Sequence, residues 1–125
     1  MVNQPVLIVD DEVSIRQMIR QSLEASGCVI SEADNGLSAL ESIKKSHPDL
    51  IISDVMMPKM SGFEVCEKAK KEHGLEDVVI VLLTAKGQEV DREKGLAAGA
   101  NEYLTKPFDP DDIYDFACET LGIDA

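Results

Sequence analysis

Leu50-Ile51-Ile52-Ser53-Asp54-Val55-Met56-Met57-Pro58 is the stretch that decides the fold. Its apolar run has the length of a strand and is bounded by His47-Pro48-Asp49 on one side and by Pro58 on the other. A continuous run of this kind is typical of the central strand of a parallel sheet, which is buried on both faces. Asp54 then stands at the C-terminal end of the strand, where open α/β sheets bind their ligands.

Apolar runs and helical patterns alternate along the rest of the chain. Strands are predicted at residues 6–9, 28–31, within 50–58, 78–83 and around 102–104, and the second of them has the weaker pattern of an edge strand. Five helices are predicted, four of them from apolar residues at helical spacing. Their apolar sets are Ile15, Ile19 and Leu23; Leu37, Leu40 and Ile43; Phe63, Cys66 and Ala69; Val90, Leu96, Ala97 and Ala98; and Ile113, Phe116, Ala117 and Leu121. Right-handed crossovers then give an α/β fold, a doubly wound five-stranded parallel sheet of the flavodoxin-like order 2-1-3-4-5.

Local signals mark where some of these helices begin. Ser61-Gly62-Phe63-Glu64 fits an S-x-x-E capping box, and Asp109 with Pro110 fits an N-cap followed by the first helical position. The fourth helix, over residues 88–98, has the least apolar material. We therefore expect it to be the least firmly docked of the five.

Composition limits the class of protein. A chain of 125 residues has the size of one compact domain, and we expect a single domain over residues 1–125. The formal net charge of −12 argues against direct nucleic-acid binding, which needs clustered Lys and Arg. No apolar run approaches a membrane span and the N-terminus lacks the basic start of a signal peptide, so we expect a cytoplasmic protein without membrane contact. Neither a disulfide framework nor a zinc site is suggested by the three widely spaced cysteines, Cys28, Cys66 and Cys118.

Residues with complementary chemistry fall at the ends of the predicted strands. Asp10 and Asp11 follow the first strand, Asp54 stands at the end of the third, and Thr84 and Lys106 follow the fourth and fifth. The first and third strands are neighbours in the predicted order, so the three carboxylates converge on one crevice. A divalent cation would relieve their repulsion, and ligands that are all oxygen indicate Mg²⁺ or Mn²⁺. With this charge neutralised, Asp54 can act as a nucleophile toward phosphorus, while Lys106 and Thr84 contact the phosphoryl oxygens.

Each of these residues also has a purely structural interpretation. The aspartates after the first strand can cap a helix, Thr84 can form a turn, and Lys106 can be a solvated charge. Their combination at four strand ends is what favours a functional site. A flavin-binding protein is disfavoured because Asp10-Asp11-Glu12 would repel a bare phosphate. A phosphatase of the haloacid-dehalogenase type is disfavoured because the first strand has no D-x-D pattern, and P-loop and G-x-G-x-x-G motifs are also absent.

Four motifs occur in order along the chain: V-D-D-E at 9–12, I-S-D-V-M-M-P-x-M-x-G at 52–62, L-L-T-A at 82–85 and A-G-A-N-E-Y-L-T-K-P-F at 98–108. Together they resemble the receiver domain of two-component response regulators, the CheY-like family, over essentially the whole chain. The resemblance implies that Asp54 accepts a phosphoryl group from a phosphohistidine on a histidine kinase or phosphotransfer protein. It implies a signalling domain rather than an enzyme, although one that takes part in its own phosphorylation and autodephosphorylation.

The resemblance also implies the metal ligands. Asp11 and Asp54 would bind Mg²⁺ directly and Asp10 through a water molecule. The backbone carbonyl of Met56 would complete the protein's share of the ligands.

A switch pair and an output face are implied in the same way. Thr84 would turn toward the phosphoryl group while the ring of Tyr103 moves inward. The fourth helix, the fifth strand and the last helix would then form the face that signals to a protein partner. We expect the unphosphorylated domain to be a monomer.

Two outputs stay open. A free-standing receiver that docks a partner is favoured because no linker or effector follows residue 125. The alternative is a receiver fragment of a longer DNA-binding or enzymatic regulator that dimerises on phosphorylation, because Thr84-Ala85-Lys86-Gly87 with Asp91-Arg92 resembles the OmpR/PhoB class. Receivers of that class dimerise with basic residues on the last helix, and this chain has none there. The acidic residues after Lys106 suggest either a partner with a basic surface or a merely solvated acidic face. From there on the chain has no Lys or Arg and six carboxylates, Asp109, Asp111, Asp112, Asp115, Glu119 and Asp124.

Overall fold

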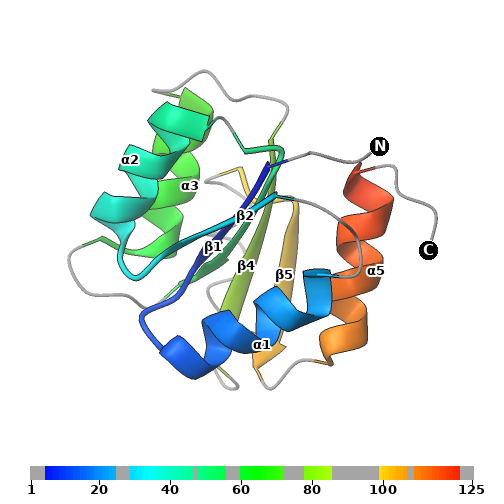
Figure 1. Cartoon of the computed structure of the whole chain (residues 1–125). Helices are drawn as coiled ribbons and strands as arrows, with labels where there is room; N and C mark the ends of the chain where they lie inside the picture. The colour runs from blue at the N-terminus through cyan, green and yellow to red at the C-terminus, as the bar shows by residue number, and fades with distance from the viewer. Residues whose placement is uncertain are drawn as a thin grey trace.

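The computed structural model describes residues 5–24, 29–46, 48–55, 60–71, 78–85, 99–106 and 109–121. These segments form one sheet with helices on both of its faces (Figure 1). Among these residues, none of the helices combines the length and the apolar character needed to cross a membrane.

The sheet has five parallel strands in the order β2-β1-β3-β4-β5, which confirms the predicted flavodoxin-like topology. The edge position of β2 agrees with its weak apolar pattern. β3 lies at the centre, and all five of its residues are buried. The strand bounds are β1 (Pro5–Val9), β2 (Val29–Ala33), β3 (Leu50–Asp54), β4 (Val79–Ala85) and β5 (Glu102–Lys106).

Helices cover the two faces of the sheet in pairs. α1 and α5 lie on one face, and α2 and α3 lie on the other (Figure 1). The predicted fourth helix, over residues 88–98, falls outside the described residues, so the described part of the chain shows four of the five expected helices. The helix bounds are α1 (Val13–Glu24), α2 (Gly36–Ser46), α3 (Gly62–Lys71) and α5 (Pro110–Leu121).

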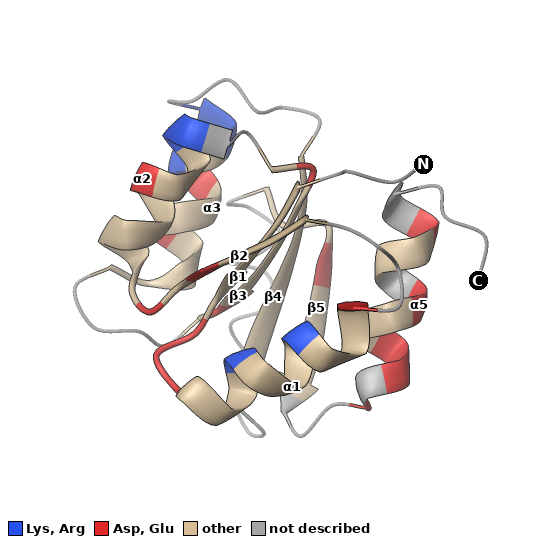
Figure 2. Cartoon of the chain, viewed as in Figure 1, with Lys and Arg blue, Asp and Glu red and all other residues tan. Residues whose placement is uncertain are grey.

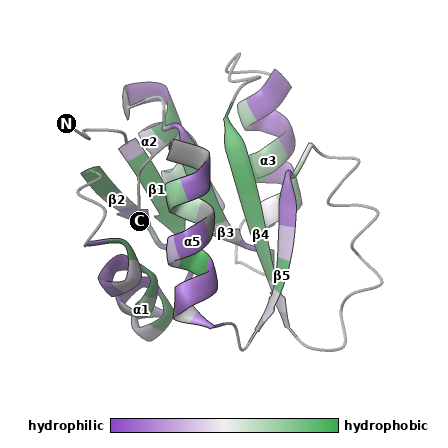
Figure 3. Cartoon of the chain, turned by 90° about the vertical axis from the view of Figure 1, so that its right-hand side faces the viewer, coloured by the Kyte–Doolittle hydropathy of each residue, from purple (hydrophilic) through white to green (hydrophobic). Residues whose placement is uncertain are grey.

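Each face of the sheet has its own apolar core. Successive strand residues point to opposite faces. Leu7 and Val9 of β1 therefore enter the core beneath α2 and α3, whereas Val6 and Ile8 enter the core beneath α1 and α5. In Figure 3 the hydrophobic strand β4 runs between the two helix layers. Cys66 is a buried thiol of the first core, and burial raises its pKa to about 11, which agrees with a packing role.

The predicted helix starts at Ser61 and Asp109 are confirmed. The Ser61 hydroxyl accepts a hydrogen bond from the backbone N–H of Glu64 at 3.3 Å. The Asp109 carboxylate accepts one from the backbone N–H of Asp111 at 2.9 Å. Each bond satisfies an N–H group that the helix itself leaves without a partner.

The predicted apolar face of α2 is wrong at its first position. Leu37 is 48% exposed, whereas Ala39 and Ile43 are buried. α2 begins at Gly36, where a Cβ atom would lie 2.8 Å from the backbone carbonyl oxygen of Met60. This close approach turns the face of Gly36, Ala39 and Ile43 inward and leaves Leu37 toward solvent.

Charge is distributed unevenly over the domain (Figure 2). The C-terminal ends of α2 and α3 lie side by side and form a lysine cluster. α5 carries only acidic charges. The lysine cluster consists of Lys44, Lys45, Lys68, Lys70 and Lys71, and the acidic residues of α5 are Asp111, Asp112, Asp115 and Glu119.

Candidate functional site

The register of the strands brings the predicted site residues to one edge of the sheet. Asp10 directly follows β1, and Asp54 ends the neighbouring β3 in matching register. Thr84 lies on β4 one residue beyond the partner of Asp54. Lys106 ends β5 one residue beyond the partner of Thr84. These four positions therefore follow one another along the carboxyl edge of the sheet, across its topological switch point.

Buried polarity is concentrated at this same edge. In the described part of the chain, the buried polar or charged residues are Asp10, Ser53, Asp54 and Thr84. Asp10 and Thr84 are fully covered, and Asp54 is 6% exposed. Burial of a carboxylate is costly, and ionisable groups kept in such positions gather at functional sites. This edge is therefore the candidate site.

An acidic group follows β1. Carboxylate oxygens of Asp10, Asp11 and Glu12 all lie within 4.8 Å of one another, and Asp11 and Glu12 are exposed. The Asp10 carboxylate also accepts a hydrogen bond from the backbone N–H of Glu12 at 2.9 Å, so it shapes the turn as well. Oxygen donors of this kind suit Mg²⁺. Glu12 was missing from the predicted ligands, Asp54 lies outside the 4.8 Å group on the neighbouring strand, and Met56 lies outside the described residues.

The end of β3 is held by main-chain contacts. The backbone N–H of Val55 donates to the Leu83 carbonyl at 2.9 Å, and the N–H of Gly62 donates to the Val55 carbonyl at 2.9 Å. The hydroxyl of Ser53 donates to the Asp54 carbonyl at 3.0 Å. A Cβ atom on Gly62 would overlap that same carbonyl oxygen and would lie 3.0 Å from the Cα atom of Val55. The sequence analysis placed Gly62 in a capping box and at the end of the 52–62 motif, and its lack of a side chain lets α3 start against the Asp54-Val55 peptide.

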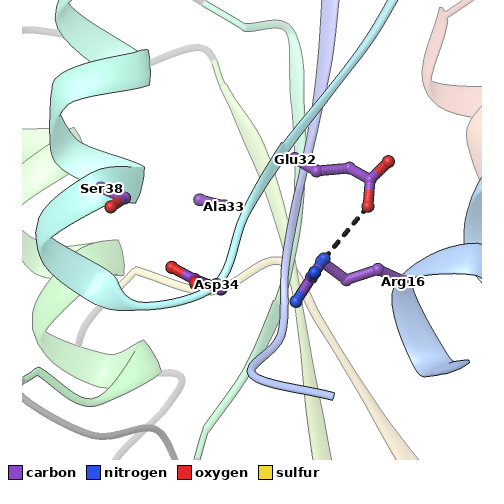
Figure 4. A pocket seen from close by; sticks show the side chains of 5 residues that line it. All are labelled: Arg16, Glu32, Ala33, Asp34 and Ser38. Carbon is purple, nitrogen blue, oxygen red and sulfur yellow. Dashed lines mark hydrogen bonds and ion pairs between the residues drawn. The ribbon is translucent and has the colours of Figure 1, made fainter. Parts of the chain in front are cut away.

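The end of β1 is held by charged side chains, which the sequence analysis missed. Arg16 donates from Nη1 to the carbonyl oxygen of Asp10 at 2.6 Å and from Nε to Glu32 at 3.1 Å (Figure 4). Arg20 donates from Nε to the other carboxylate oxygen of Glu32 at 2.6 Å. The available signal was a pair of arginines one helical turn apart, on the helix that follows the acidic loop.

The two arginines lower the pKa of the Glu32 carboxyl group. Burial acts to raise its pKa, but the hydrogen bonds and charges of Arg20 and Arg16 outweigh burial and hold the pKa below its ordinary value. A hollow of about 270 Å³ lies beside the pair, between β2 and the starts of α1 and α2 (Figure 4). Its lining residues are Arg16, Glu32, Ala33, Asp34 and Ser38.

The ring of Tyr103 already lies inside the protein. It is 5% exposed and belongs to the core beneath α2 and α3, whereas the next residue, Leu104, packs on the other face of the sheet. The resemblance implied that this ring moves inward on phosphorylation, and that movement stays a prediction. The side chain of Lys106 falls outside the described residues.

Fold and site together define an α/β domain with an acidic site at the switch point of a flavodoxin-like sheet. The family model of the response regulator receiver domain matches residues 6–117, and the chain belongs to this family. It is therefore a signalling domain of two-component response regulators rather than a conventional enzyme.

Curated relatives include two transcriptional regulators. The phosphate regulon transcriptional regulatory protein PhoB of Pseudomonas aeruginosa is 43% identical over 113 residues, which cover 90% of this chain and 49% of PhoB. The alkaline phosphatase synthesis transcriptional regulatory protein PhoP of Bacillus subtilis is 41% identical over 111 residues, which cover 89% of this chain and 45% of PhoP. The chain thus spans about half the length of these relatives.

Solved structures show the same fold. The chemotaxis response regulator CheY4 of Vibrio cholerae superposes with a TM-score of 0.86 at 35% identity, covering 95% of this chain and 99% of CheY4. A CheY-like response regulator receiver domain protein from Methanospirillum hungatei gives a TM-score of 0.87 at 29% identity, covering 96% of this chain and 94% of that protein.

Proposed function

We propose that residues 1–125 form a receiver domain that accepts a phosphoryl group on Asp54 in a Mg²⁺-dependent reaction. The donor is the phosphohistidine of a histidine kinase or of a phosphotransfer protein. One observation carries the proposal: Asp54 is buried at the end of the central strand, with Asp10 and Thr84 buried beside it on the two neighbouring strands. A nucleophile, a carboxylate for the metal site and a hydroxyl donor are thereby available at one edge of the sheet.

The residues of the edge fit a hard divalent cation. Asp11, Asp54 and the backbone carbonyl of Met56 would hold the ion directly, and Asp10 would hold it through a water molecule. Donors that are all oxygen suit Mg²⁺, and also Mn²⁺. When bound, the ion neutralises the charge that would otherwise keep a carboxylate and a phosphoryl group apart. Glu12 adds negative charge beside these ligands, which favours a cation.

Asp54 carries the chemical step. One of its carboxylate oxygens forms a bond to phosphorus while the bond from phosphorus to the histidine nitrogen breaks. The leaving nitrogen keeps the electron pair of that bond, and the imidazole leaves as a neutral ring because its other nitrogen carries a proton. The Thr84 hydroxyl donates to a phosphoryl oxygen, and Lys106 supplies a compact cation for the same group.

Thr84 and Tyr103 form the switch pair. Phosphorylation adds negative charge and strong acceptor oxygens next to the Thr84 hydroxyl, which turns toward them. The ring of Tyr103 is 5% exposed and fits within the core beneath α2 and α3, which supports an inward position of the ring in the switched state. Thr84 also precedes the connection to residues 88–98, which passes the change on.

Phosphoryl transfer from acetyl phosphate tests the nucleophile. The change Asp54→Asn removes the attacking oxygen, so intact-mass measurement should show complete loss of the phosphorylated species. Asp49→Asn is the matched control, because Asp49 is exposed at the opposite end of β3 and should label like the unaltered protein. Undiminished labelling of Asp54→Asn, or full labelling of the unaltered protein in excess EDTA, would contradict the proposal.

The output is a protein partner that docks on residues 88–98, β5 and α5, without direct nucleic-acid binding by this domain. The acidic residues of α5 favour a basic surface on that partner. The domain is a monomer before phosphorylation.

A second output has its own support. The relatives PhoB and PhoP are named as transcriptional regulators and are about twice as long as this chain, which favours a receiver within a longer regulator that dimerises on phosphorylation. Sedimentation with and without beryllofluoride, a phosphoryl mimic, separates the two. A tight dimer with the mimic supports the second output, and an unchanged monomer supports partner docking.

A further inference from the structure

Three hydrogen bonds between described residues help to hold Asp10 in place. Its backbone N–H donates to the Ala33 carbonyl at 3.1 Å, which extends the pairing of β1 with β2 by one residue. Its carboxylate accepts from the backbone N–H of Glu12 at 2.9 Å. Its carbonyl oxygen accepts from Nη1 of Arg16 at 2.6 Å. The first two contacts use groups of β2 and of the loop itself, whereas the third depends on the side chain of a residue in α1.

The contact to Arg16 acts on the next residue of the loop. The carbonyl of Asp10 belongs to the planar peptide unit that joins Asp10 to Asp11. Holding that oxygen therefore also places the backbone N–H and the Cα atom of Asp11, so that rotation about the N–Cα bond of Asp11 is what remains to set the direction of its side chain. A short bond from a guanidinium is among the stronger hydrogen bonds in proteins.

Arg16 is itself held in one orientation. Its Nε donates to Oε1 of Glu32, while Oε2 of the same carboxylate accepts from Arg20. The side chain of Arg16 is 15% exposed, compared with 38% for Arg20. When Nε of a planar guanidinium is hydrogen-bonded, the directions of its two other nitrogens are fixed as well. The single ammonium group of Lys could not reproduce this geometry.

We infer that Arg16 is a positioning residue for the metal site: it orients the Asp10-Asp11 peptide so that Asp11 is preset to bind Mg²⁺, with Glu32 holding Arg16 in place. This inference rests on the proposed Mg²⁺-dependent function. Arg16 touches neither the ion nor the phosphoryl group in this scheme. It acts through the main chain, as residues around metal ligands commonly do.

Positioning and charge predict opposite effects when Arg16 is replaced. Loss of a cation near the carboxylates makes the loop more negative, so charge alone predicts tighter Mg²⁺ binding. Loss of the bond to the Asp10 carbonyl frees the peptide, and the ion must then order it, so positioning predicts weaker binding. Glu32 is shared by Arg16 and Arg20 and offsets part of the field of Arg16, and we expect positioning to be the larger effect. The sign of the change in affinity therefore decides between the two.

Calorimetric titration of the unphosphorylated full chain with MgCl₂ provides the test. Arg16→Gln should raise the dissociation constant about tenfold, the lower end of the range for residues that orient metal ligands. Arg20→Gln is the matched control: it removes the same charge from α1 and the same kind of bond to Glu32, but does not touch Asp10. It should change the dissociation constant by less than about twofold, because its charge is exposed and screened.

A second measurement does not depend on the metal. In metal-free protein, the backbone amides of Asp11 and Glu12 should exchange with solvent faster in Arg16→Gln than in the unaltered protein. Arg20→Gln should leave these two amides unchanged. Arg16→Lys can bond the Asp10 carbonyl but cannot reproduce the fork to Glu32, so it should restore part of the lost affinity.

The outcomes are distinct. Mg²⁺ binding by Arg16→Gln that is as tight as in the unaltered protein or tighter, with unchanged amide exchange, would overturn the positioning role. Equal weakening by Arg20→Gln would overturn it too, because the effect would then be one of charge or general stability. Failure of the unaltered chain to bind Mg²⁺ would refute the proposed function, and the positioning role would fall with it.

Discussion

The two carboxylate-bearing strand ends of the site are built in different ways. At the end of β3, Asp54 is buried, and main-chain hydrogen bonds and the close approach of Gly62 hold its surroundings. At the end of β1, Asp11 and Glu12 are exposed, and the loop depends on the charged side chain of Arg16. Packing does not respond to salt or moderate changes of pH, whereas ion pairs respond to both. The nucleophile should therefore keep its place under conditions that loosen the metal-binding loop.

Gly62→Ala should cause the largest loss of stability, because it disrupts the contact between α3 and the end of β3. The added methyl group meets the carbonyl oxygen of Asp54 in a place where backbone surrounds it. We expect a loss of about 3 kcal/mol in the free energy of unfolding, the upper part of the usual range for overpacking. Urea denaturation measures it. Glu67→Ala on the exposed side of α3 is the control and should change stability by less than about 0.5 kcal/mol. Equal stability of the two variants would show that the close approach of Gly62 is not required.

Ser61→Ala should have an intermediate effect on the same end. It removes the hydroxyl that accepts from the backbone N–H of Glu64 at the start of α3. Loss of such a cap costs about 1 kcal/mol, again measured by urea denaturation. Ser22→Ala is the control, because the Ser22 hydroxyl bonds to the Met18 carbonyl in the interior of α1, where such a bond adds little. The cost of Ser61→Ala should be the same in low and high salt, and a strong salt dependence would contradict the comparison.

Glu32→Gln should have the smallest effect and would sharpen the contrast at the β1 end. Its ion pairs are partly exposed, so we expect a loss of only about 0.5 kcal/mol at neutral pH and low salt. The pKa of Glu32 is held below its ordinary value of 4.5, so the stabilisation is present above pH 4.5 and is lost as the pH falls through the folded-state pKa. Stability curves of both proteins from pH 7 to pH 3, and at 1 M salt, should converge at low pH and at high salt. A difference that persists under both conditions would mean that Glu32 acts by packing rather than by charge.

Most of the fold could be predicted because, in α/β proteins of this kind, local apolar patterns show where the strands and helices lie, and the strand order follows from their alternation. The run of β3 is buried on both faces and has no charged residue before Asp54, which makes it recognisable in isolation. The strand order then brings Asp10, Asp54 and Thr84 to one edge without knowledge of any side-chain contact. The helix over residues 88–98 stays a prediction.

The contacts that support the site could not be predicted in the same way. Arg16 reaches back six residues to Asp10 and sideways to Glu32, and many rotamers of a long side chain are compatible with the sequence pattern. The close approach of Gly62 to the carbonyl of Asp54 could not be predicted, because a contact with the main chain leaves no trace in side-chain patterns. Leu37 was placed inside because its spacing from Leu40 is helical, whereas the start of α2 at Gly36 decides which face turns inward.

The separation of the lysine cluster from the acidic helix α5 makes the domain an electric dipole as well as an anion of net charge −12. Such a field exerts torque on an approaching charged molecule before the two surfaces meet. A positively charged partner is attracted toward α5 and repelled from the lysine-bearing ends of α2 and α3. A larger share of its collisions with the domain therefore occurs at α5. Recruitment speed should therefore drop steeply as ionic strength rises, even where the final complex is held by uncharged contacts.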